Sequence, residues 1–181
     1  PEATGYGCVY FAQSMLHTRG EQFAGKRVVI SGSGNVAQYA CEKAIQLGAK
    51  VLTVSDSNGF VKFPDSGMTE AHVAALLELK NERRERLSVY AKEQGLAYFA
   101  DQKPWGVPCD IALPCATQNE LDETAAKTLL ANGVQCVAEG ANMPSTLGAV
   151  EAFTQAKILY APGKASNAGG VATSGLEMSQ N

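Results

Sequence analysis

The sequence has no marked excess of either charge and no long apolar run. Its 181 residues include 15 Lys and Arg against 18 Asp and Glu, which gives a formal net charge of −3. A chain that binds nucleic acid or an anionic membrane through surface charge usually has a strong positive balance, so neither partner is expected. No apolar run approaches the ~18–20 residues that span a bilayer, so no membrane insertion is expected.

Histidine is scarce, and the cysteines lack the spacing of a metal site or a disulfide framework. The two histidines, His17 and His72, lie far apart in the sequence. None of the five cysteines forms a CxxC pair, so a zinc site is not expected. An odd number of cysteines without such pairs is typical of a reduced, cytoplasmic chain whose thiols behave as small core hydrophobes.

What the sequence does contain is typical of one α/β domain. Its hydrophobic content is 45%, its charged content is 18%, and it holds 18 glycines, which fits a folded chain of this class. A prior of ~100–200 residues per domain favours a single domain over residues 1–181. The chain begins at Pro1 and stops within a predicted helix, so we expect it to be part of a longer polypeptide.

Hydrophobic patterns predict strands and helices that alternate along the chain. Such alternation is typical of a doubly wound, mostly parallel sheet with helices on both faces. A polar, turn-rich stretch at 57–67 is expected to form a small hairpin, Thr4 and Thr69 to cap helices, and Gly48 and Gly95 to end them. The predicted strands cover 26–31, 50–56, 97–99, 110–113, 135–138 and 158–160. The predicted helices cover 4–18, 35–47, 68–95, 122–132 and 146–155.

The turn after the first predicted strand carries a dinucleotide-binding pattern. The pattern G-x-G-x-x-A is matched by Gly32, Ser33, Gly34, Asn35, Val36 and Ala37. Its first glycine permits a tight turn, its second lets a pyrophosphate approach the backbone, and the helix N-terminus offers N–H groups to the phosphates. Asp56 follows Gly34 by 22 positions, where a carboxylate that bonds the adenosine ribose is expected. Other doubly wound proteins use the same turn, so the pattern alone leaves them open.

The residues themselves leave the choice between NAD and NADP open. The Asp56 carboxylate suits the free 2′-hydroxyl of NAD and repels the 2′-phosphate of NADP, whereas Ser57 can donate to a phosphate. Lys80, Arg83 and Arg86 follow at i, i+3 and i+6 on the long predicted helix. This stripe is either a phosphate-binding surface or a solvated helix face with ion pairs along it.

Stretches spread over the whole chain resemble one family. They are PEATGYG at the start, SGSGNVAQYA at 31–40, DIALPCATQNEL at 110–121, AEGANMP at 138–144 and APGKASNAGGVATSGLEMSQN at 161–181. Together they resemble the cofactor domain of the hexameric, bacterial type of glutamate dehydrogenase, which usually uses NADP. The resemblance implies that an amino-terminal substrate domain and the closing C-terminal helices are absent, and that the parent protein is a homo-hexamer.

The resemblance assigns cofactor-binding roles along the chain. It implies that the glycine turn holds the pyrophosphate and that the basic stripe accepts the 2′-phosphate, so NADP is expected in preference to NAD. Asp56 is then expected to turn away or to be compensated by these cations. Residues 116–118 are expected at the nicotinamide ribose and Asn142 at the nicotinamide side. The full set is Gly32, Ser33, Gly34, Asn35, Val36, Asp56, Ser57, Lys80, Arg83, Arg86, Ala116, Thr117, Gln118 and Asn142.

The resemblance also implies which residues face the substrate. Asn167 is expected to bond the α-carboxylate end or the cofactor, and Ser174 the side-chain carboxylate of the substrate. For both, helix capping and packing remain an alternative. The residues expected at the substrate are Thr4, Asn167, Gly170, Val171 and Ser174.

The implied reaction is reversible: L-glutamate, NADP and water give 2-oxoglutarate, ammonia and NADPH. In the family, the lysine and the carboxylate that transfer protons lie in the amino-terminal domain, so no catalytic residue is expected in this chain. We therefore expect it to bind the cofactor without oxidising glutamate on its own. Two alternatives stay open: the cofactor domain of a leucine, valine or phenylalanine dehydrogenase, and a stand-alone nucleotide-binding module.

Overall fold

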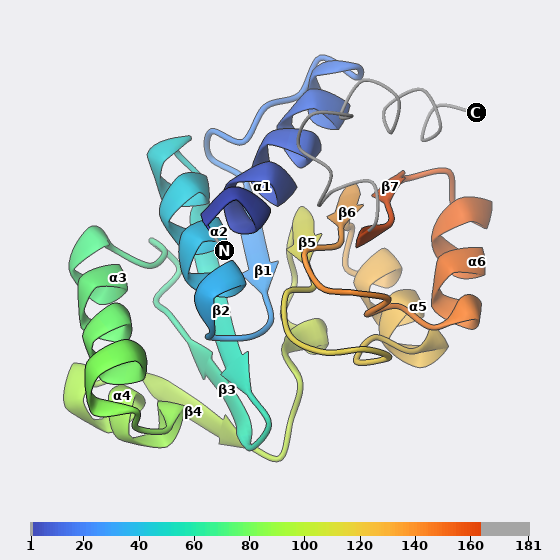
Figure 1. Ribbon diagram of the computed structural model, residues 1–181. Coiled ribbons are helices and arrows are strands. Elements are labelled where there is room, and N and C mark those ends of the chain that lie inside the picture. The colour runs from blue at the N-terminus through green and yellow to red at the C-terminus, as the bar shows by residue number, and fades with distance from the viewer. Residues whose placement is uncertain (1, 164–181) are drawn as a thin grey trace.

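In the computed structural model, which describes residues 2–163, seven strands form one sheet (Figure 1). The strands are β1 (Arg27–Ile30), β2 (Lys50–Asp56), β3 (Gly59–Lys62), β4 (Ala97–Ala100), β5 (Ile111–Leu113), β6 (Cys136–Ala138) and β7 (Leu159–Ala161). Their order in the sheet is β4-β3-β2-β1-β5-β6-β7. β2, β1, β5, β6 and β7 pair with their neighbours in parallel, whereas β3 and β4 form an antiparallel edge next to β2.

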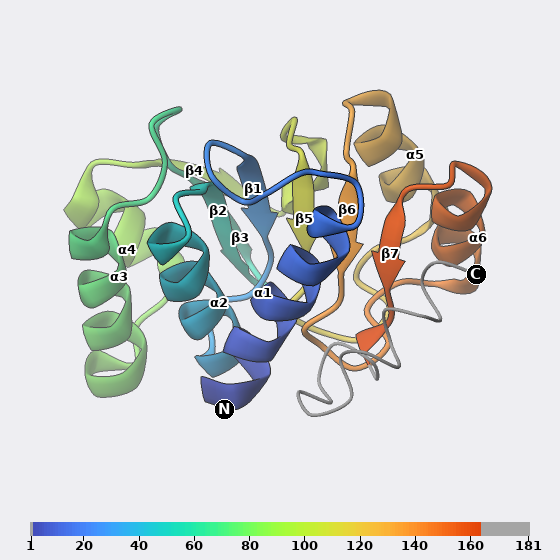
Figure 2. The same ribbon diagram turned by 90° about the horizontal axis from the view of Figure 1, so that it is seen from above.

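Helices cover both faces of the sheet. They are α1 (Glu2–His17), α2 (Asn35–Gln46), α3 (Glu70–Leu77), α4 (Leu87–Gln94), α5 (Glu123–Ala131) and α6 (Leu147–Gln155), with a π-helical segment η1 (Glu78–Arg83) and a 3₁₀ turn η2 (Pro104–Gly106). Buried residues of α1 to α4 form one core with the sheet, and those of α5 and α6 form a second core. Figure 1 shows α1 and α2 in front of the strands, and Figure 2 gives the same layers from above.

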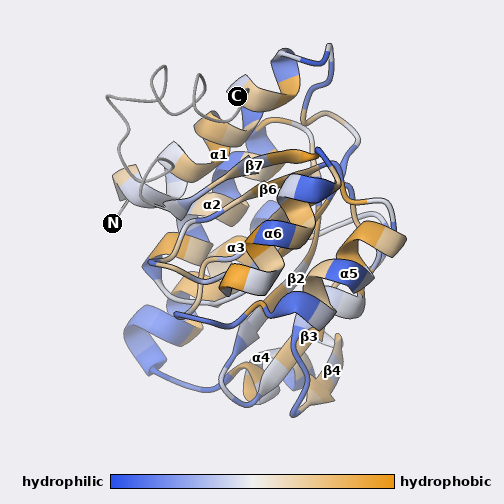
Figure 3. Ribbon diagram, turned by 90° about the vertical axis from the view of Figure 1, so that its right-hand side faces the viewer, coloured by the Kyte–Doolittle hydropathy of each residue, from blue (hydrophilic) through white to orange (hydrophobic). Residues whose placement is uncertain are grey.

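The central strands are buried on both sides, and this explains their sequence. Along β1, Val28 and Ile30 belong to the first core and Val29 belongs to the second. Every residue of β5 and β6 is buried. Parallel strands that are covered on both faces have continuous apolar runs in place of an alternating pattern. The outer helices α5 and α6 carry both hydrophobic and hydrophilic residues, as Figure 3 shows. The prediction of a doubly wound, mostly parallel sheet is confirmed.

The single long helix predicted over 68–95 is wrong. Helix α3 ends at Leu77, η1 follows, and the chain turns at Arg84, whose φ of 54° is left-handed. Residues 81–86 are all exposed, so no apolar side chain there packs a continuous helix onto the core. The helix restarts as α4 where Leu87 is buried again.

The alternation of strand and helix fails at the connection after β2. Strand β3 follows β2 through a tight turn and pairs with it antiparallel, so the hairpin predicted within 57–67 uses β2 as its first strand. Strand β4 then pairs with β3, and the rings of Phe60 and Phe99 stack with centroids 4.8 Å apart. This hairpin edge borders the end of β2.

The predicted helix caps have different outcomes. The Thr69 hydroxyl accepts the N–H of His72, and His72 Nδ1 accepts the N–H of Thr69, which completes a capping box on α3. Gly95 is the left-handed C-cap of α4, with φ of 68°. Thr4 is not a cap, because α1 already begins at Glu2.

Candidate functional site

A pocket of about 610 Å³ opens at the carboxyl ends of β1, β2 and β5. In open parallel sheets, ligands bind where the strand order reverses, and here that point lies between β1 and β5. The pocket is lined by the glycine turn 32–36, the end of β2 at 55–57, residues 101–103 after β4, residues 115–117 after β5, and Glu120. The predicted cofactor residues that line it are Gly32, Ser33, Gly34, Asn35, Val36, Asp56, Ser57, Ala116 and Thr117.

The glycine turn owes its shape to two different glycines. Gly32 has φ of +88°, and a Cβ there would lie 2.7 Å from the carbonyl oxygen of Cys115. Only glycine therefore fits where the turn meets the loop after β5. Gly34 precedes α2 in an extended conformation, and a Cβ there would meet nothing within 4 Å. The space beside Gly34 is open to a ligand.

The amino end of α2 faces this pocket without a side-chain cap. Such a helix end presents N–H groups and a partial positive charge to an anion. Two buried polar side chains fix the turn from behind. Ser55 Oγ accepts the N–H of Gly32 at 2.8 Å, and Gln38 Nε2 donates to the carbonyl oxygen of Ser33 at 2.8 Å. Sequence patterns give no signal for either residue: Ser55 acts across a tertiary contact, and Gln38 is one polar residue among several on α2.

The Asp56 carboxylate is occupied by neighbouring donors. Its Oδ1 accepts the N–H of Asn58 at 2.9 Å, and its Oδ2 accepts the N–H of Leu87 at 3.1 Å. Lys80 Nζ lies 3.9 Å from Oδ2. Burial lowers the pKa of Lys80, and the charge of Asp56 opposes that shift. Asp56 therefore fixes the start of α4 and has a cation beside it.

The basic residues predicted to form one stripe lie in different surroundings. Lys80 is next to Asp56, whereas Arg83 makes a bidentate ion pair with Glu93 at 2.6 and 2.8 Å. Arg86 is the N-cap residue of α4. The chain leaves α-helical geometry between these residues, so their sequence spacing no longer places them on one face. Lys80 and Arg86 stay close to the end of β2, and Arg83 is held by α4.

On the other side of the pocket, the loop after β5 is tied to a buried carboxylate. Glu120 Oε2 accepts the N–H of Ala116 at 2.9 Å and the N–H of Thr117 at 3.1 Å. Glu120 is 7% exposed, and burial raises the pKa of its carboxyl group. No sequence pattern marks Glu120, which is one polar residue among several in its loop.

Other predicted residues do not line the pocket. Gln118 and Asn142 are exposed, and Thr4 is half-buried in the first turn of α1. Asn142 belongs to the loop after β6, where the N–H groups of residues 140–141 donate to the carbonyl oxygen of Pro114. That contact places the loop beside the end of β5. Outside the described residues lie Asn167, Gly170, Val171 and Ser174.

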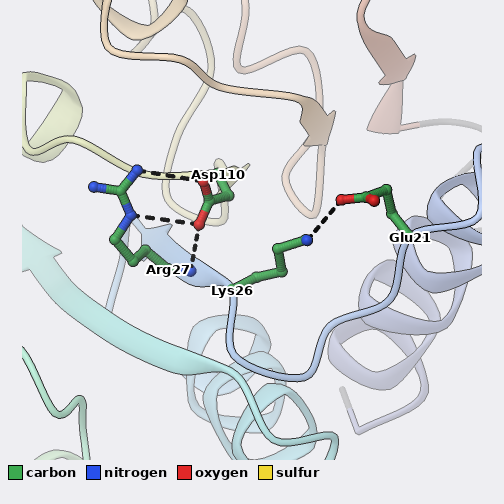
Figure 4. A network of polar contacts seen from close by, with 4 residues as sticks. All are labelled: Glu21, Lys26, Arg27 and Asp110. Carbon is green, nitrogen blue, oxygen red and sulfur yellow. Dashed lines mark hydrogen bonds and ion pairs between the residues drawn. The ribbon is translucent and has the colours of Figure 1, made fainter.

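The amino ends of the central strands are joined by charge. Asp110, just before β5, accepts the N–H of Arg27 at 2.8 Å and lies 3.3 Å from Arg27 Nη2 (Figure 4). Burial pushes the pKa of Asp110 upward, but the hydrogen bonds and charge of Arg27 outweigh burial and hold that pKa below its usual value. Beside them, Lys26 Nζ contacts Glu21 at 2.6 Å.

Between residues 2 and 163, no three His, Cys, Asp or Glu side chains are grouped so that they could hold a metal ion. The helices of the same segment also include none with the length and apolar content to cross a membrane. All five cysteines are buried thiols. Burial raises the pKa of Cys41 and of Cys109 to about 12.

Comparison with known proteins gives consistent matches over the whole chain. The family model of the glutamate/leucine/phenylalanine/valine dehydrogenases matches residues 1–181. The chain is 62% identical to the NADP-specific glutamate dehydrogenase of Escherichia coli (strain K12), over 100% of this chain and 40% of the relative. It is 61% identical, with the same coverage, to the NAD(P)-specific glutamate dehydrogenase of Xylanibacter ruminicola.

A solved structure supports the same relationship. The crystal structure of Plasmodium falciparum glutamate dehydrogenase superimposes with a TM-score of 0.90 at 51% identity, covering 99% of this chain and 38% of that protein. The chain thus spans about 40% of the length of the curated relatives that it matches.

Proposed function

The chain belongs to the glutamate/leucine/phenylalanine/valine dehydrogenase family, and on this basis we propose that it is the cofactor-binding domain of an NADP-dependent glutamate dehydrogenase. The whole protein would interconvert L-glutamate, NADP and water with 2-oxoglutarate, ammonia and NADPH. The cofactor, when bound, supplies the hydride acceptor. The part of this chain is to bind and orient the cofactor, and no proton-transferring residue is assigned to it.

The observation that carries the proposal is the open space beside Gly34 at the uncapped amino end of α2. A Cβ at Gly34 would meet no protein atom within 4 Å, which leaves room for a ligand, and Gly34 lines the pocket directly before α2. Helix N–H groups and their partial charge suit a pyrophosphate at this place. The pocket of about 610 Å³ extends from there toward β2 on one side and β5 on the other.

On the adenosine side, the charges favour NADP. Asp56 already accepts two backbone N–H groups and has Lys80 3.9 Å away, so its negative charge is offset where a 2′-phosphate would lie. Ser57, Lys80 and Arg86 would hold the 2′-phosphate beside it. Arg83 would join them only by leaving Glu93, with which it is paired. The relative named as NADP-specific supports this assignment, whereas the relative named for NAD(P) fits either cofactor.

On the nicotinamide side, the loop after β5 would bind the ribose. Ala116 and Thr117 line the pocket there, and Gln118 and Asn142 would reach the cofactor from adjoining positions. The substrate-facing roles of Thr4, Asn167, Gly170, Val171 and Ser174 belong to the same proposal. So do the substrates L-glutamate, 2-oxoglutarate and ammonia, and assembly as a homo-hexamer.

Equilibrium binding tests the cofactor assignment. The protein expressed from its complete gene is titrated with NADPH and with NADH, and nucleotide fluorescence gives each Kd. We expect tighter binding of NADPH, and we expect Gly34→Ala to raise its Kd at least about tenfold, since the methyl group fills the phosphate space. Gly106→Ala is the matched control, because a Cβ there also meets nothing within 4 Å. Wild-type protein that binds neither nucleotide, or a Gly34→Ala variant that binds NADPH normally, would refute the assignment.

The substrate is tested by initial rates with NADP. We expect the complete protein to oxidise L-glutamate much faster than L-leucine, L-valine or L-phenylalanine. The 181-residue chain alone is expected to bind NADPH without forming it from glutamate. A complete protein that prefers leucine would move the chain to a different branch of its family. Glutamate-dependent NADPH formation by the chain alone would place a catalytic residue within it.

A further inference from the structure

Glu120 has a buried carboxylate that none of the roles above uses. Its Oε2 accepts two consecutive backbone N–H groups, those of Ala116 at 2.9 Å and Thr117 at 3.1 Å. These two residues line the pocket on the side of β5. With both N–H groups bonded to one carboxylate, the loop is fixed in one conformation where it lines the pocket.

The same carboxylate reaches the other side of the pocket through Ser31. The Ser31 side chain lies near the Glu120 carboxylate and lowers its pKa, which favours the charged form of the acid. Ser31 Oγ also accepts the N–H of Cys115 at 3.0 Å. Because Ser31 directly precedes Gly32, Glu120 connects the loop after β5 to the start of the glycine turn.

The backbone of Glu120 holds a third segment. Its carbonyl oxygen accepts Lys103 Nζ at 3.1 Å and Trp105 Nε1 at 3.2 Å. Trp105 is buried and belongs to the second core, whereas Lys103 lines the pocket. The connection between β4 and β5 is thereby fixed to the same residue as the two pocket loops.

Burying a carboxylate is costly unless its oxygens are hydrogen-bonded. The N–H groups of Ala116 and Thr117 donate to the Glu120 carboxylate, and Ser31 and the nearby charge of Lys103 also favour its charged form. A buried carboxylate that accepts N–H groups of a loop fixes the conformation of that loop. We propose that Glu120 is a positioning residue, which holds the nicotinamide side of the pocket in register with the glycine turn. This inference rests on the proposed function, since it names a residue that shapes that cofactor site.

The test compares two substitutions in the protein expressed from its complete gene. Glu120→Ala removes every acceptor on the side chain, whereas the amide oxygen of Glu120→Gln still accepts N–H bonds in nearly the same place. We expect Glu120→Ala to raise the Kd of both NADPH and NADH by about tenfold, and by the same factor, because the nicotinamide half is common to both. Its kcat is also expected to fall. Glu120→Gln is expected to stay within about threefold of wild type in both constants.

A neighbouring carboxylate provides the matched control. Asp122 Oδ1 accepts the N–H of Ala125 at 2.8 Å and caps α5, but Asp122 does not line this pocket. Asp122→Ala is therefore expected to lower the Tm while leaving both Kd values unchanged. Equal losses of affinity in Glu120→Ala and Asp122→Ala would reduce the effect to general destabilisation and overturn the inference.

Two other outcomes would also overturn it. Unchanged binding by Glu120→Ala would show that the loop keeps its conformation without the carboxylate. A loss of NADPH binding alone would place the effect on the adenosine side. Failure of the wild-type protein to bind either nucleotide is a separate result, which refutes the proposed function itself.

Discussion

At their amino ends, β1 and β5 are joined by the Arg27–Asp110 ion pair, and the segments that follow their carboxyl ends line the pocket. Each end contains a carboxylate that is tied to backbone N–H groups. Arg27 holds the pKa of Asp110 below its usual value, whereas burial raises the pKa of Glu120. The folded chain therefore stabilises the charged form of Asp110 relative to water, and it destabilises the charged form of Glu120.

This difference separates the residues that stabilise the sheet from those that shape its site. At the amino end, Arg27 and Asp110 bond each other and leave little charge or hydrogen-bonding capacity for a ligand. The carboxyl end keeps a helix terminus uncapped and a glycine open to space, at some cost in stability. Substitutions at the amino end should thus alter unfolding and spare binding, while most at the carboxyl end should do the reverse.

The largest effect is expected where the carboxyl end is itself closely packed. Gly32→Ala puts a Cβ 2.7 Å from a carbonyl oxygen at φ of +88°, so we expect it to lower the free energy of unfolding by about 2–4 kcal/mol. Urea denaturation measures this loss. Gly34→Ala, with φ of −81°, is expected to unfold like wild type. Equal stability of the two variants would remove the distinction between the two glycines.

The next effect concerns binding alone. Lys80→Met removes the cation beside Asp56, and we expect the KM for NADP to rise about tenfold with the KM for NAD almost unchanged. Initial-rate kinetics with both cofactors measures the difference. Lys92→Met, on the exposed part of α4, is the control and should change neither constant. Equal increases for NADP and NAD would leave Lys80 as a counter-ion of Asp56 with no part in binding the 2′-phosphate.

At the amino end, the expected effect is on stability alone. Asp110→Asn keeps an acceptor for the N–H of Arg27 but removes the charge, which should lower the free energy of unfolding at pH 7 by about 1 kcal/mol. Because the folded pKa of Asp110 lies below its usual value, this stability is present above pH ~4 and is lost as the pH falls through the folded pKa. Denaturation curves of both proteins should therefore converge in acid. A changed Kd for NADPH would contradict the separation of the two ends.

The smallest effect is expected from releasing Arg83. The hydrogen bonds of Arg83 lower the pKa of Glu93, so the pair is charged at neutral pH. Glu93→Gln weakens the pair and should lower the KM for NADP about twofold, because Arg83 becomes available to the 2′-phosphate. The gain should shrink at high salt, where such exposed charges are screened. An unchanged KM would leave Arg83 outside the phosphate site.

The fold could be predicted where local sequence decides structure. The strand predicted at 50–56 matches β2 at both ends, since a buried run lies between Gly48 and the polar stretch that begins at Ser57. The glycine turn at 32–36 could also be predicted, because the spacing of its glycines follows from the backbone conformation of a strand–turn–helix unit. The predicted roles of the residues along it remain predictions until the binding experiments are made.

The rest depended on tertiary contacts that no local pattern encodes. The polar run at 81–86 is compatible with a helix, but it has no apolar side chain that anchors a helix to the core. Ser31 meets Cys115 across a fold that brings distant segments together, whereas Glu120 bonds Ala116 within its own loop, in a geometry that no turn pattern marks. Their residue types are common in loops, so the sequence gives no reason to single them out.

Two buried cysteines can report where the molecule opens first. Cys109 directly precedes Asp110 at the amino end of β5, and Cys115 lies just past the carboxyl end of the same strand. The Cys8 side chain and burial raise the pKa of Cys115, and burial raises that of Cys109, so neither thiol reacts readily with an alkylating reagent in the closed fold. Labelling of Cys115 before Cys109 would record opening of the pocket before the amino end separates. Each end of β5 thus has a thiol whose labelling rate reports the opening of that end.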